Sequence, residues 1–91
     1  MKGIYKTHGT CSQQIEIEMD DNTHVIHSVL FIGGCPGNTN GISQLVVGQK
    51  AEDVIARLQG ITCGVKPTSC PDQLAKALTA FIDKIEQNKE Q

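Results

Sequence analysis

Residues 13–32, QQIEIEMDDNTHVIHSVLFI, decide the fold of this chain. Within 13–19, isoleucine or methionine alternates with glutamate, which is the period-two pattern of a half-buried antiparallel strand. Residues 20–22 are Asp-Asp-Asn and supply the chemistry of a turn. Residues 23–32 carry apolar side chains on both faces, as a central strand covered on two sides does. The whole stretch therefore predicts a β-hairpin.

The segments on either side of this hairpin predict one more strand and then helices. Residues 3–6 are β-branched or aromatic at their centre, which favours a short strand. After the polar residues 38–40, apolar side chains return at helical spacing as far as Leu58, with a break at Gly48. The pattern therefore predicts two helices, one on each side of Gly48. Gly60 stands just past the end of the second, at the position where a C′ glycine belongs.

The last helix has the clearest sequence pattern. Its apolar residues recur at i, i+4, i+7, i+8 and i+11, namely Leu74, Leu78, Phe81, Ile82 and Ile85. Ser69 and Asp72 have the spacing of a capping box, and Pro71 falls in the first turn. The polar segment 87–91 is expected to fray. We therefore expect a capped helix that buries one face.

Strands first and helices later predict an α+β fold, a small antiparallel sheet of about three strands followed by two or three helices packed on one face. The 91 residues fit one domain spanning 1–91 and are too few for a barrel enzyme or a doubly wound nucleotide fold. If helices cover only one face of residues 23–32, the other face or a strand edge is available to pair in a homodimer.

The charge balance and hydropathy exclude several classes of protein. Eight basic and ten acidic residues give a net charge of −2, and no basic cluster exists, which argues against nucleic-acid binding. No apolar run approaches the ~20 residues of a membrane span, so we expect no membrane association. Residues 1–9 lack the apolar core of a signal peptide. We therefore expect a cytoplasmic protein, whose cysteines are metal ligands or redox groups more often than disulfides.

The four cysteines all fall at predicted element boundaries: Cys11, Cys35, Cys63 and Cys70. None belongs to a predicted apolar stripe, and three stand close to glycine, which lets backbone approach a ligand. Four thiolates from separate loops suit a tetrahedral zinc site. No C-x2-C pair is present, so the residues leave open two alternatives, idle reduced thiols or a redox pair of Cys63 and Cys70, with disulfides the last choice.

Other candidate groups favour structural interpretations. His24 and His27 point to opposite faces of a strand, so they cannot easily share a ligand, and we expect surface or hydrogen-bonded imidazoles. His8 is a candidate substitute or outer ligand beside Cys11. The glycine-rich residues 33–41 resemble an anion-binding loop, but a tight connection around Cys35 is the preferred interpretation.

Residues 68–72, Thr-Ser-Cys-Pro-Asp, spell the signature of the TSCPD domain family. Residues 73–78, 33–35 and 60–63 also resemble that family, and the resemblance extends over about 5–85. TSCPD domains occur at the C-terminus of adenosylcobalamin-dependent ribonucleotide reductases and as small stand-alone proteins. The resemblance implies that the four cysteines match the family's own four and form a metal site.

Independent catalysis of ribonucleotide reduction conflicts with the length of the chain. The reaction needs a thiyl radical enclosed in a large barrel, which 91 residues cannot provide. It also needs a reducing cysteine pair, and the sequence has no C-x-x-C or similarly close pair to deliver electrons. We therefore expect no catalytic residues and an accessory or binding module whose partner is a ribonucleotide reductase or another protein. The alternatives are a thiol-redox or nucleotide-binding subunit in ribonucleoside-diphosphate reduction and, more remotely, a nucleic-acid-binding module.

Overall fold

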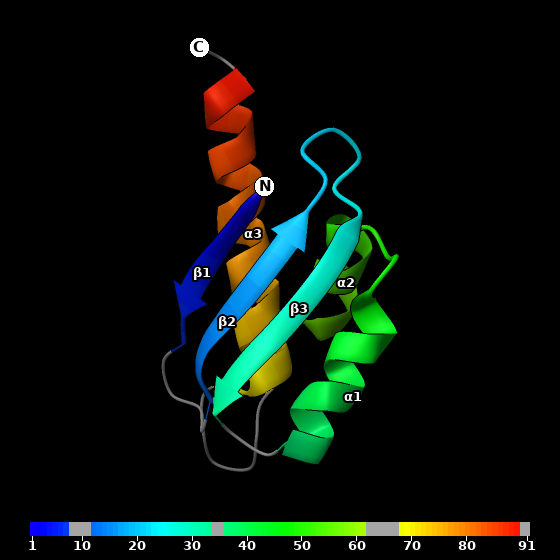
Figure 1. Ribbon diagram of the computed structural model, residues 1–91, viewed down its shortest axis with the longest axis vertical. Helices are drawn as coiled ribbons and strands as arrows, with labels where there is room; N and C mark the ends of the chain where they lie inside the picture. Colours follow the sequence, from blue (N-terminus) through cyan, green and yellow to red (C-terminus); the bar gives the residue numbers. More distant parts are fainter. Residues whose placement is uncertain (8–11, 34–35, 62–67, 90–91) are drawn as a thin grey trace.

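The computed structural model describes residues 1–7, 12–33, 36–61 and 68–89 (Figure 1). Within these residues, three strands precede three helices: β1 (Lys2–Lys6), β2 (Ser12–Met19), β3 (Ile26–Gly33), α1 (Pro36–Val46), α2 (Ala51–Leu58) and α3 (Cys70–Lys89). The strands form one antiparallel sheet in the order β1-β2-β3. The predicted α+β class and the predicted hairpin of β2 and β3 are confirmed.

The alternating strand β2 lies at the centre of the sheet. Ile15 and Ile17 are fully buried on the face that the helices cover, as the period-two pattern predicts. The expectation that residues 23–32 form the central strand was wrong. β1 pairs with β2, which leaves β3 at an edge, and Leu30 on its uncovered face is 51% exposed.

The helices lie on one side of the sheet (Figure 1). α3 packs against β2, α1 packs against β3, and α2 packs against α3. The apolar stripe of α3 enters the core, where Leu74 and Leu78 are fully buried. Gly3 of β1 allows the Phe81 ring to come close, because a Cβ at Gly3 would stand 3.0 Å from Phe81 Cζ. The core is mostly aliphatic and includes the two phenylalanines, Phe31 and Phe81.

The helix boundaries follow the sequence signals with two differences. Gly60 has a φ of 86° directly after the C-cap of α2, which confirms the predicted C′ glycine. α1 begins at Pro36, before the polar residues 38–40 that were expected to precede it. α3 continues to Lys89, into the segment 87–91 that was expected to fray.

Candidate functional site

Cys70 is the one predicted site residue that lies within the described part of the chain. It is the first residue of α3, as its position after the predicted cap implies, and it is 6% exposed within the main hydrophobic cluster. The expectation that it lies outside the apolar stripe was wrong. Cys70 stands four residues before Leu74, so both side chains lie on the same face of the helix.

Cys11, Cys35 and Cys63 fall outside the described residues, so the four-cysteine site stays a prediction. Their neighbours are described, however. Ser12 follows Cys11 directly and pairs in register with Gly33, which stands two residues before Cys35. The segments that lead to Cys11 and Cys35 therefore leave the sheet side by side, at the end of the molecule where α3 begins (Figure 1).

The start of α3 is held by the predicted cap. The Ser69 hydroxyl accepts a hydrogen bond from the Asp72 backbone N–H at 3.2 Å, and the Gln73 N–H bonds to the Ser69 carbonyl at 2.8 Å. The same Ser69 hydroxyl donates to the Ile61 carbonyl at 2.6 Å. Ser69 is therefore both the N-cap of α3 and a direct link to the residues that follow α2.

Asp72 has a different set of partners from the one that a capping box supplies. Its Oδ1 accepts the Gly60 N–H at 2.7 Å, its Oδ2 accepts the Thr68 hydroxyl, and Lys76 Nζ lies 3.4 Å from Oδ2. The hydrogen bond from Thr68 is the main cause that lowers the pKa of the Asp72 carboxyl, although burial opposes it. This carboxylate is 4% exposed and ionised at neutral pH, and it joins the end of α2 to the start of α3.

These hydrogen bonds form one network, which we term the helix-start network. It comprises the side chains of Thr68, Ser69, Asp72 and Gln73 and the backbone of Gly60 and Ile61. Gln73 Nε2 completes it by donating to Thr68 Oγ1 at 3.0 Å. The network fixes both ends of the segment that contains Cys63, because Ile61 precedes that segment and Thr68 follows it. The polar residues of the Thr-Ser-Cys-Pro-Asp sequence thus have structural partners. The predicted cap is confirmed for Ser69, whereas the Asp72 carboxylate binds Gly60 and Thr68 and does not return a hydrogen bond to the Ser69 N–H.

His24 has a more specific setting than the sequence suggested. It lies in the β2–β3 connection with a φ of 62°, and it is 8% exposed. Its Nδ1 is 2.6 Å from Glu52 Oε2 of α2, while its buried Nε2 lies 3.6 Å from Glu86 Oε1 of α3 and has no hydrogen-bond partner among the described residues. The hydrogen bond to His24 lowers the pKa of Glu52.

The expectation of a hydrogen-bonded imidazole is therefore confirmed for His24, and His27 is exposed. The two carboxylates beside His24 lie far from it in the sequence, so no local signal predicts them. Across residues 1–7, 12–33, 36–61 and 68–89, no three His, Cys, Asp or Glu side chains are grouped closely enough to hold a metal ion. Within that part of the chain, His24 thus joins three elements and lacks the ligands of a metal centre.

A family model described as TSCPD domain matches residues 3–82 of the 91-residue chain. A search of curated proteins found no significant match, and a search of solved structures found none either. Among the described helices, none combines the length and the apolar character that crossing a bilayer requires.

Proposed function

Because the chain belongs to the TSCPD domain family, we propose that it is a small zinc-binding accessory module whose ligands are Cys11, Cys35, Cys63 and Cys70. Four thiolates are the donor set of a closed, tetrahedral structural zinc site. Such a site has no open coordination position for a substrate. The role of the metal is therefore to hold loops together, and no residue of the chain acts as a catalyst.

The observation that carries this proposal is the arrangement of the residues that flank the four cysteines. The pairing of Ser12 with Gly33 brings together the segments that lead to Cys11 and Cys35. The hydrogen bond from Ser69 to Ile61 joins the residue next to Cys70 to the segment that leads to Cys63. Both groups of flanking residues lie at the same end of the sheet (Figure 1).

The position of Cys70 suits a zinc ligand. It is the first residue of α3, so a metal bound there would lie at the positive end of a 20-residue helix. Its low exposure keeps competing water away from a bound metal. A chain of this length has a modest core, and a metal that crosslinks its loops adds the stability that the core lacks.

The accessory role rests on the resemblance to modules of ribonucleotide reductases. We infer that the partner is a ribonucleotide reductase or another protein, encountered in the reducing cytoplasm, where thiolates remain available to zinc. The net charge of −2 and the absence of a basic cluster in the sequence disfavour nucleic acid as the partner.

The test combines elemental analysis with a thiol count on protein purified without a metal-affinity column. We expect about one zinc per chain and four thiols that react with a disulfide reagent only after denaturation with a chelator. Cys70→Ser should lose the metal and unfold at lower urea concentration, whereas the control Ser28→Ala, on the exposed face of β3, should keep both the metal and the stability. Fully folded, metal-free protein would refute the proposal, and a reversible Cys63–Cys70 disulfide would favour the redox alternative.

A further inference from the structure

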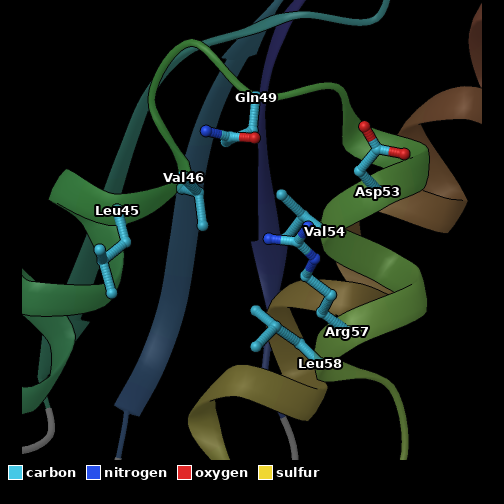
Figure 2. Close-up of a pocket in the computed structure, with 7 residues that line it drawn as sticks. All are labelled: Leu45, Val46, Gln49, Asp53, Val54, Arg57 and Leu58. Atoms are coloured by element: carbon cyan, nitrogen blue, oxygen red, sulfur yellow. The ribbon is translucent and has the colours of Figure 1, made fainter.

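A groove separates α1 from α2 on the surface of the molecule (Figure 2). Its volume is about 280 Å³, and its lining includes apolar Leu45, Val46, Val54 and Leu58 with charged Asp53 and Arg57. We term it the α1–α2 groove. None of the residues that line it is a proposed zinc ligand or a member of the helix-start network. The groove is therefore separate from the proposed metal site.

Leu45 is the reason to expect that the groove is covered in solution. Its side chain is 77% exposed, more than any other large apolar side chain in the described residues, and it lies beside the hollow. Val46, Val54 and Leu58 line the same hollow beside Leu45. Apolar side chains that gather around a hollow mark an interaction surface.

The charges of α2 indicate which partner fits. Asp53 and Arg57 stand one helical turn apart on the face that lines the groove, and in the described part of the chain neither forms an ion pair. An antiparallel copy of α2 related by a two-fold axis brings Asp53 of each chain opposite Arg57 of the other. The same operation places the two grooves face to face, each with its own Leu45.

We propose that the α1–α2 groove is the interface of a two-fold homodimer of this chain. Two Asp53–Arg57 pairs form the rim and the apolar side chains fill the centre, which is the usual arrangement of an interface. A helix from an unrelated protein would have to supply both charges in reverse order, whereas a second copy supplies them by symmetry.

The uncovered face of the sheet is a poorer dimer interface than the groove. Its central strand β2 presents Glu16 and Glu18 on that face, beside the lysines of β1. Two such faces can stack about a two-fold axis that runs either parallel or perpendicular to the strands. Because β2 is the central strand, it lies opposite its own copy in both arrangements. Acidic side chains then oppose acidic side chains, which disfavours this alternative.

The first test measures mass in solution by light scattering and sedimentation across a wide concentration range. We expect a concentration-dependent dimer for the wild-type chain and a monomer for Leu45→Glu. Leu30→Glu is the matched control, because Leu30 is also an exposed leucine, at 51%, but lies on the sheet face. A wild-type monomer at every concentration would overturn the proposal, and so would equal dissociation by the two variants.

Charge reversal gives a second test that does not depend on the apolar contacts. Asp53→Arg and Arg57→Asp should each weaken self-association by about tenfold, since each replaces two attractive pairs by two repulsive ones. The double variant should dimerise again, and the two single variants should form a heterodimer when mixed. Failure of both rescues would overturn the interface. Circular dichroism and the zinc content of each sample separate this result from loss of the fold or of the metal.

Discussion

Asp72→Asn removes the charge of the helix-start network with almost no change in shape. The carboxylate accepts the Gly60 N–H at 2.7 Å and the Thr68 hydroxyl, and its side chain is 5% exposed. The amide retains one oxygen, so only one of these two donors keeps its acceptor. The other donor is left facing an NH2 group in a buried site.

The expected loss follows from these contacts. A hydrogen bond to a buried charged group contributes about 1.5–3 kcal/mol, and the charge near the N-terminus of α3 adds up to about 1 kcal/mol. The ion pair with Lys76 adds little, because that lysine is 54% exposed. We therefore expect Asp72→Asn to lower the free energy of unfolding by about 2–4 kcal/mol, and the melting temperature by about 8 °C or more.

The assay is urea unfolding followed by circular dichroism at neutral pH, with Asp83→Asn as the control. Asp83 is an exposed carboxylate on the same helix, and its substitution should change stability by less than about 0.5 kcal/mol. If Asp72→Asn unfolds at the same urea concentration as this control, the network does not hold the two helix ends together. The structural explanation of the Thr-Ser-Cys-Pro-Asp sequence would then fail.

The pH dependence of the same variant tests the charge itself. The pKa of Asp72 lies below its usual value of 3.8, so the ionised carboxylate stabilises the fold fully above that value. This contribution disappears as the pH falls through the lower pKa of the folded state. The stability difference between the wild type and Asp72→Asn should therefore be constant near neutral pH and narrow below about pH 4. A difference that grows on acidification would contradict the assignment.

Two further substitutions test contacts elsewhere in the fold. His24→Asn removes the 2.6 Å contact with Glu52 and should lower the free energy of unfolding in urea by about 1–2 kcal/mol. His27→Asn is the control, because His27 is exposed on β3, and it should lower that free energy by less than about 0.5 kcal/mol. Equal effects would show that the His24 contact does not stabilise the fold. Gly3→Val places a Cβ 3.0 Å from Phe81 Cζ and should lower stability by about 1–3 kcal/mol, so an unchanged melting temperature would show that the ring shifts freely.

The sequence predicts those parts of the fold that depend on residues close to one another along the chain. The β2–β3 hairpin follows from alternation and a turn within 13–32, and the start of α3 follows from Ser69 and Pro71. The position of β1 beside β2 is a non-local choice. Apolar residues on both faces of 23–32 suggested a central strand, yet Leu30 is exposed at an edge.

The sequence predicted which residues belong to the candidate site better than it predicted the contacts that these residues make. Cys70 was expected at the start of a helix, but its burial was missed, although its spacing from Leu74 carries that signal. The partners of Asp72 and His24 were not predictable, because Gly60 contributes only its backbone N–H and Glu86 comes from a distant helix. Such contacts depend on how α2 and α3 pack, which local patterns do not determine.

The most direct test of the central proposal is the ratio of zinc to protein, measured by elemental analysis together with the count of thiols accessible in the native state. The proposal predicts about one zinc per chain and thiols that become reactive only when the metal is removed. A folded chain that contains no metal and four reactive thiols would contradict it.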